Sequence, residues 1–137
     1  MLLAEASARI ERLEPHAAFE AVEAGASLVD IRSDVDRERE GVVPGALHIP
    51  RTVLEWRFAG EPGWRNPYIG AVERQVVLIC DHGYSSVFAA AALVDLGYRV
   101  ADVVGGFEAW RAAGLPTAPG AIHRRAHGEP AGMRPPD

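Results

Sequence analysis

Hydrophobic and polar positions along this chain follow two patterns, one typical of buried strands and the other of helices. Short, uninterrupted apolar runs predict strands that are covered on both faces of a parallel sheet. The run "QVVLIC" at 75–80 is of this kind, and we expect it to be a central strand. The other predicted strands lie at 9–15, as a short edge strand, and at 27–31, 43–49 and 100–104.

Segments between these runs carry apolar residues at helical spacing, with capping and stop residues at their ends. Pro15 opens one such segment and Gly25 closes it. Ser33 is placed to cap a short, charged helix. The predicted helices are 2–9, 15–25, 33–40, 51–58, 85–97 and 105–116.

Helical spacing also indicates which side chains of two helices face the interior. In the helix predicted at 51–58, we expect Val53, Leu54 and Trp56 on the inner side. Phe107 and Trp110 share one face of the last helix, and Trp110 is expected to anchor it in the core.

Strands alternate with helices, which predicts an α/β fold with a central parallel sheet and helices on both faces. The 137 residues suit a single domain. We expect 1–8 to be an N-terminal extension and 9–117 the folded domain. The segment 59–70 is dense in Gly and Pro and is expected to be a loop, and 118–137 is expected to be a flexible Pro/Gly/Arg tail.

Composition excludes several classes of function. The net charge of −5 argues against nucleic acid as a partner. No run reaches the roughly 20 apolar residues of a membrane span, and the N-terminus lacks the features of a signal peptide. We therefore expect a cytoplasmic protein without a membrane partner.

Metal sites and cofactors are not expected either. The single cysteine cannot form an internal disulfide or a cysteine-based zinc site unaided. His123 and His127 have i, i+4 spacing, but a Gly/Pro-rich tail is a poor metal scaffold.

The single cysteine, Cys80, ends the predicted central strand just before a helix, where parallel sheets bind ligands. If the loop curls around the sulfur, successive main-chain N–H groups converge on it. Gly83 permits the positive φ of such a curl, and Ser85 and Ser86 can cap the helix and add hydroxyl donors. Such surroundings favour a nucleophilic thiolate. The alternative is an inert thiol that packs as a small hydrophobe.

Four segments in succession make the chain resemble a single rhodanese domain, the sulfurtransferase fold. The resemblance covers about residues 9–117 and implies a rhodanese-like three-layer fold with a central parallel sheet. The matching segments are "LVDIR" at 28–32, "GVVPGALHIP" at 41–50, "VVLICDHGYSS" at 76–86 and "LGYRVADVVGGFEAWRAAGLP" at 96–116.

The resemblance implies a sulfurtransferase of the thiosulfate type that works as a monomer or weak dimer, with Cys80 as the catalytic residue. The Cys80 thiolate attacks the outer sulfur of a small anionic donor such as thiosulfate, and a persulfide remains. No second cysteine can resolve it, so an external thiol or cyanide must accept the sulfur. The anion-binding loop is expected to comprise Asp81, His82, Gly83, Tyr84, Ser85 and Ser86.

Two positions depart from the family pattern. Ser85 stands where the common loop, C-x-x-G-x-R-S, has an arginine, so a fixed cation facing the donor is missing. Val42 replaces a histidine of the Pro-Gly segment. Arg51 or Arg57 can reach over the pocket to replace the lost charge; alternatively, both are solvated surface residues.

Other charged neighbours admit more than one role. A protonated His82 would favour the thiolate and Asp81 would oppose it, or both side chains point to solvent. Tyr84 either walls the pocket mouth or covers the loop. We expect Asp30 and Arg32 to form a structural ion pair beneath the site.

Two alternatives to sulfur transfer stay open. The first is a non-catalytic module of the same fold that binds sulfur or a partner, or senses oxidants, through Cys80. The second is a cysteine phosphatase or arsenate reductase. Such phosphatases clamp the phosphate with an arginine at the position that Ser86 occupies here.

Overall fold

Five strands form one sheet in the order β1-β5-β4-β2-β3, and every strand pairs in parallel with its neighbour. The computed structural model describes residues 3–59, 65–69 and 72–120. The predicted parallel sheet is confirmed, with β4 in the centre and β1 at an edge. The strands are β1 (Glu11–Leu13), β2 (Ser27–Asp30), β3 (Leu47–His48), β4 (Val76–Ile79) and β5 (Val100–Val103).

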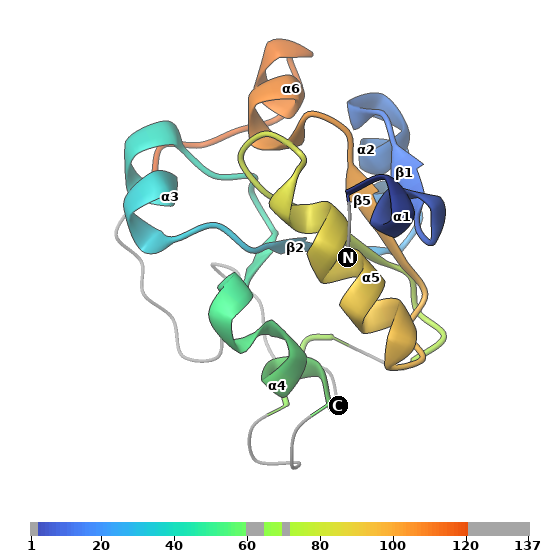
Figure 1. The fold of residues 1–137 in the computed structure, drawn as a ribbon. Helices are drawn as coiled ribbons and strands as arrows, with labels where there is room; N and C mark the ends of the chain where they lie inside the picture. The colour runs from blue at the N-terminus through green and yellow to red at the C-terminus, as the bar shows by residue number, and fades with distance from the viewer. Residues whose placement is uncertain (1–2, 60–64, 70–71, 121–137) are drawn as a thin grey trace.

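Helices connect the strands, as the sequence pattern predicts (Figure 1). The helix predicted at 51–58 is divided into a 3₁₀ turn, η1 (Arg51–Val53), and an α-helix. Part of the predicted loop, 60–64 and 70, lies outside the described residues, as do His123, His127 and the tail from 121. The α-helices are α1 (Leu3–Ala8), α2 (Pro15–Glu23), α3 (Asp34–Glu40), α4 (Leu54–Ala59), α5 (Ser85–Asp95) and α6 (Gly106–Ala112).

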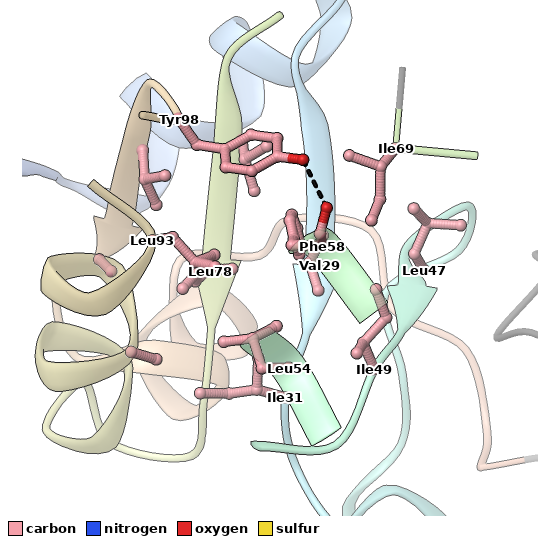
Figure 2. Packing of buried hydrophobic residues seen from close by; sticks show 14 of the residues in the cluster. Val29, Ile31, Leu47, Ile49, Leu54, Phe58, Ile69, Leu78, Leu93 and Tyr98 are labelled. Atoms are coloured by element: carbon pink, nitrogen blue, oxygen red, sulfur yellow. Dashed lines mark hydrogen bonds between the residues drawn. The ribbon is translucent and has the colours of Figure 1, made fainter. Parts of the chain in front are cut away.

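One face of the sheet packs against α4 and α5, as Figure 2 shows. Leu78 of β4 and Val29 of β2 meet Leu54 and Leu93 from these helices. Tyr98 closes this cluster, and its hydroxyl donates a hydrogen bond to the main-chain oxygen of Phe58 at 2.6 Å. Each fully buried aliphatic side chain contributes about 1.5–3 kcal/mol to stability, so this face supports the centre of the sheet.

The opposite face packs against α2 and α6. Val77 and Ile79, which alternate with Val76 and Leu78 along β4, join Phe107 in this second cluster. All four residues of β4 are fully buried because helices cover both faces of the strand. The three-layer α/β arrangement expected from the sequence is therefore confirmed.

The predicted interior of residues 51–58 is partly wrong. Leu54 is buried, but the Trp56 side chain is 52% exposed, and the buried aromatic residue of α4 is Phe58. Residues 54 and 58 are one helical turn apart and face the sheet together, whereas position 56 lies between them. Trp110 is buried in the core as expected, and its Nε1 donates a hydrogen bond to the Pro116 oxygen at 2.9 Å.

Segments near both ends of the described chain contact the domain. Ala6 of α1 packs against Val87 and Ala91 of α5. Val42 forms an isolated antiparallel bridge with Ala118. The boundaries 1–8, 9–117 and 118–137 stay predictions. No helix in the described residues has the length and hydropathy needed to span a bilayer.

Candidate active site

The loop from Cys80 to Tyr84 joins β4 to α5 at the carboxyl end of the sheet. Its carbonyl groups are held by neighbouring elements. The amides of Phe107 and Glu108, at the start of α6, donate to the oxygens of Cys80 at 2.6 Å and Asp81 at 3.1 Å. Because its carbonyl groups are occupied in this way, the loop can turn amides towards the sulfur.

Two main-chain amides donate to the Cys80 sulfur, from Gly83 at 3.2 Å and from Ser86 at 3.4 Å. The sulfur is also 3.3 Å from the Ser86 hydroxyl oxygen, to which the thiol donates. Cys80 is only 5% exposed and borders the hydrophobic core, yet it also lines a pocket of about 340 Å³. The thiol therefore lies at the boundary between core and pocket, in a setting that stabilises negative charge on sulfur.

Gly83 and Gly106 make this loop geometry possible. Gly83 has φ +85°, and a Cβ there would lie 2.6 Å from the Gly105 nitrogen. Gly106 has φ +62°, and a Cβ there would lie 2.6 Å from the Asp81 carbonyl carbon. Both positions combine a left-handed conformation with close backbone contact, which only glycine accommodates without strain.

A buried polar network lies beneath the sulfur. The Ser86 hydroxyl donates to Asp102 Oδ2 at 2.8 Å, and Asp102 is fully buried in β5. Arg12 of β1 donates to both carboxylate oxygens, at 2.8 and 3.0 Å, and to the Gly83 oxygen at 2.8 Å. The hydrogen bond with Asp102 raises the pKa of Arg12. This network holds the loop in place, because Arg12 bonds both to Asp102 and to the main chain of Gly83.

Arg12 and Asp102 were not among the site residues predicted from the sequence. A signal was present for Asp102, because "VADVV" places a carboxylate inside an otherwise apolar strand, and a buried charge requires a partner. The partner itself could not be identified, since Arg12 lies on a strand that is distant in sequence and adjacent only in the folded sheet.

The expectation that Ser85 and Ser86 cap α5 is wrong. The N-cap residue is Tyr84, which has helical dihedral angles, and no side chain makes a capping hydrogen bond. The helix thus begins before the serine hydroxyls could reach its first amides. Ser86 is fully buried and bonds to Asp102 instead, and Ser85 is exposed at the pocket rim.

Arg51 and Arg57 are not among the residues that line the pocket in the described part of the chain. Arg51 forms an ion pair with Glu55 at 2.6 Å, within η1 and α4. Burial lowers the pKa of Arg57. The arginine that lines the pocket is Arg32. The hypothesis that Arg51 or Arg57 supplies the missing charge therefore finds no support in the geometry.

Asp30 and Arg32 form the expected buried ion pair, with Arg32 Nη2 at 2.8 Å from Asp30 Oδ2. The Arg32 guanidinium also lies 4.0 Å from the centre of the Phe107 ring. Arg37 of α3 adds a second cation to Asp30 at 3.2 Å. These contacts hold Arg32 in one orientation at the base of the pocket.

Asp81 directs its carboxyl group towards α3. One of its oxygens and one oxygen from each of Asp36 and Glu40 lie within 4.8 Å of one another. Burial, together with the charges of Glu40 and Asp36, raises the pKa of Asp81 to about 6. The Arg32 guanidinium, 3.9 Å from Asp81, opposes the binding of a metal cation in this group.

The remaining loop side chains lie near the mouth of the pocket. The His82 ring is 2.8 Å from Glu108 of α6 and is largely exposed, so it contacts a carboxylate and does not point freely into solvent. Tyr84 is 65% exposed and lines the pocket. His82 and Ser85 line it as well. Four of the predicted loop residues, from Asp81 to Ser85 without Gly83, thus line the pocket with Asp36 of α3, and Gly83 and Ser86 contact the sulfur through their amides.

Comparisons with known proteins agree with this architecture. Residues 7–113 match the family model described as rhodanese-like domain. A thiosulfate sulfurtransferase GlpE from Actinobacillus pleuropneumoniae serotype 3 (strain JL03) is 38% identical over 106 residues, which are 76% of this chain and 89% of that protein.

Solved structures give the same result for the fold. A protein of unknown function from Rhodopseudomonas palustris, described as a possible tyrosine phosphatase, has a TM-score of 0.77 and 34% identity over 84% of this chain and 89% of its own. The polysulfide-sulfur transferase homodimer from Wolinella succinogenes has a TM-score of 0.70 at 23% identity, over 91% and 90% of the two chains. The chain therefore belongs to the rhodanese-like domain family and is an enzyme of the sulfurtransferase type.

Proposed function

We propose that this enzyme moves a sulfane sulfur from a small anionic donor, such as thiosulfate, to an external thiol or to cyanide, through a persulfide on Cys80. The two amide hydrogen bonds to the sulfur support this proposal most directly. Amides in this arrangement stabilise the attacking thiolate and the charged persulfide that follows. The proposal makes Cys80 the catalytic residue and residues 81–86 the anion-binding loop.

The reaction proceeds in two displacements. In the first, the Cys80 thiolate attacks the outer sulfur of thiosulfate, the donor S–S bond breaks, and sulfite leaves with the bonding electron pair. In the second, an acceptor thiolate or cyanide attacks the outer sulfur of the persulfide, and the Cys80 thiolate is the leaving group. The acceptor is external because the chain has one cysteine.

Phosphoryl transfer fits the site less well. The position of the phosphate-clamping arginine is occupied by Ser86, whose hydroxyl is engaged by the buried carboxylate of Asp102 at 2.8 Å. A carboxylate beneath the loop opposes a phosphate dianion, and no bidentate guanidinium stands in its place. A non-catalytic module that senses oxidants or binds a partner through Cys80 is the remaining alternative. A cytoplasmic location and a monomer or weak dimer stay predictions.

Intact-mass measurement tests the proposal. The reduced protein is incubated with thiosulfate, and separately with 3-mercaptopyruvate, and should gain the mass of one sulfur atom. Added cyanide should remove that mass and release thiocyanate. Cys80→Ser should gain nothing while retaining the circular dichroism spectrum of the parent protein.

Two results would contradict sulfur transfer. Failure of the parent protein to gain sulfur from either donor, together with hydrolysis of an aryl phosphate, would favour the phosphatase. Absence of both activities would favour the non-catalytic module that senses oxidants or binds a partner through Cys80.

A further inference from the structure

The pocket beside Cys80 contains one guanidinium and two carboxyl groups. Arg32, Asp36 and Asp81 all line it, next to the reactive sulfur. A donor such as thiosulfate carries two negative charges, so this charge arrangement bears directly on which donors the pocket accepts.

One nitrogen of the Arg32 guanidinium lacks a hydrogen-bond acceptor within the described residues. Its side chain is 1% exposed, Nε and Nη2 bond to Asp30 at 3.0 and 2.8 Å, and Nη2 also bonds to the Gly41 oxygen at 2.8 Å. Nη1 is buried and makes no hydrogen bond within the described residues. A buried guanidinium nitrogen without an acceptor is costly, and it is suited to meet an anionic oxygen.

Asp81 places a carboxylate close to that nitrogen. Its Oδ1 lies 3.9 Å from Arg32 Nη1, beyond hydrogen-bonding distance, and it too is buried without a hydrogen bond in the described structure. The charge of Asp81 is thus close enough to attract Arg32, which is also paired with Asp30, but its oxygen is too far away to accept a hydrogen bond from Nη1. An incoming anion would have to share Arg32 with this carboxylate.

Other charged groups around Asp81 add to its effect. From α3, Asp36 and Glu40 each place one carboxyl oxygen within 4.8 Å of an oxygen of Asp81. From α6, Glu108 faces the loop but is paired with His82 at 2.8 Å. Arg39 of α3 pairs with Asp36 at 2.7 Å and with Glu40 at 3.4 Å, whereas the cation beside Asp81 itself is Arg32, at 3.9 Å. Three carboxyl groups therefore meet two guanidinium groups here, and only Arg32 of these two lines the pocket.

We propose that Asp81 is a specificity-determining residue, whose carboxylate competes with the donor for Arg32 and so makes the pocket prefer sulfur donors with one negative charge to doubly charged thiosulfate. This inference rests on the proposed sulfur transfer through Cys80. It assigns the substrate class as monoanionic sulfane-sulfur donors, such as thiosulfonates and small persulfides.

A pair of donors with the same reacting bond isolates the effect of charge. Thiosulfate and methanethiosulfonate both present a terminal sulfur bonded to an oxidised sulfur, and they differ by one negative charge. With methanethiosulfonate, the Cys80 thiolate attacks the terminal sulfur, the S–S bond breaks, and methanesulfinate leaves with the electron pair. The ratio of the two kcat/KM values cancels effects on the thiolate itself.

The test measures this ratio for the parent enzyme and for Asp81→Asn, with cyanide as the acceptor. Removing one charge beside the donor should raise the ratio of thiosulfate to methanethiosulfonate about tenfold at neutral pH. Asp36→Asn should raise the ratio by a smaller factor, since Asp36 also pairs with Arg39 at 2.7 Å. Asp34→Asn is the matched control on α3, where the carboxyl is 59% exposed, and should leave the ratio unchanged.

The ratio should also depend on pH in the parent enzyme. Asp81 has a pKa of about 6, so its carboxyl is neutral below this pH and charged above it. The ratio should fall as the pH rises through about 6, and it should stay flat in Asp81→Asn. A flat ratio in both proteins, or an equal ratio for parent and Asp81→Asn, would overturn the inference. Failure to transfer sulfur from either donor would instead overturn the proposed function.

Discussion

Gly83 connects the backbone of the loop with the chemistry of the sulfur. Its amide is one of the two main-chain donors to Cys80, and its carbonyl oxygen is held by Arg12 at 2.8 Å. Its φ of +85° turns the chain so that both groups are used. The loop therefore depends on a conformation that other residues adopt only with strain.

Gly83→Ala should destabilise the protein by about 2–4 kcal/mol, since strain at positive φ and the clash with Gly105 add together. It should also reduce sulfur uptake by Cys80. Gly45→Ala is the matched control, because its φ is +84° and its added Cβ would have nothing within 4 Å. Gly45→Ala should lower the free energy of unfolding by only about 1 kcal/mol, because it introduces the dihedral strain alone. Urea unfolding of both variants checks the difference, and equal losses would show that close packing at Gly83 has no effect.

At the scale of elements, α5 links the active-site loop to the core. Its first turn contains Ser86, which bonds beneath the sulfur, and its later turns pack on the sheet. Leu93 is fully buried near the end of the helix, whereas Leu96, its C-cap residue, is 44% exposed. The anchoring of the helix should therefore depend on Leu93.

Leu93→Ala should lower the free energy of unfolding by about 2–5 kcal/mol, because it removes buried methyl groups and leaves a cavity. Leu96→Ala removes the same atoms from a half-exposed position and should cost less than about 1 kcal/mol. Chemical denaturation measured on both variants gives the comparison. Similar losses for the two would mean that α5 is not held by its buried face.

At the scale of the whole molecule, the site introduces a pH dependence into folding. Burial, Glu40 and Asp36 raise the pKa of Asp81 from its ordinary value of 3.8 to about 6. The folded state thus binds this proton more tightly than the unfolded chain. The stabilising contribution of the proton is complete below the unfolded pKa and is lost as the pH rises through about 6. The charge that remains at neutral pH opposes folding.

Asp81→Asn should therefore stabilise the protein at about pH 7 and have little effect at about pH 4. Because Asp81 is partly solvated, we expect a gain of about 1 kcal/mol. Denaturation curves at the two pH values test this, with Asp34→Asn as a control on the exposed side of α3. A gain of the same size at both pH values would be inconsistent with the loss of a titrating carboxylate.

Local patterns in the sequence were sufficient to predict the sheet, the helices and the position of Cys80. The apolar run that forms β4, and the helical spacing on either side of it, depend on neighbouring residues only. The positive φ at Gly83 follows from the same local rules, since a short turn from strand to helix requires it. The sequence by itself thus determined that a single thiol lies at the carboxyl end of a central parallel strand.

Only the tertiary structure decided which charged groups surround that thiol. Arg12 and Asp102 meet because β1 and β5 are neighbours in the sheet, although they lie at opposite ends of the domain in sequence. Asp36 approaches Asp81, and Arg32 lines the pocket where Arg51 or Arg57 was expected, because of how α3 and the loop pack. Electrostatic interactions depend on the distance between charges in the folded structure, and the periodicity of the sequence does not give that distance.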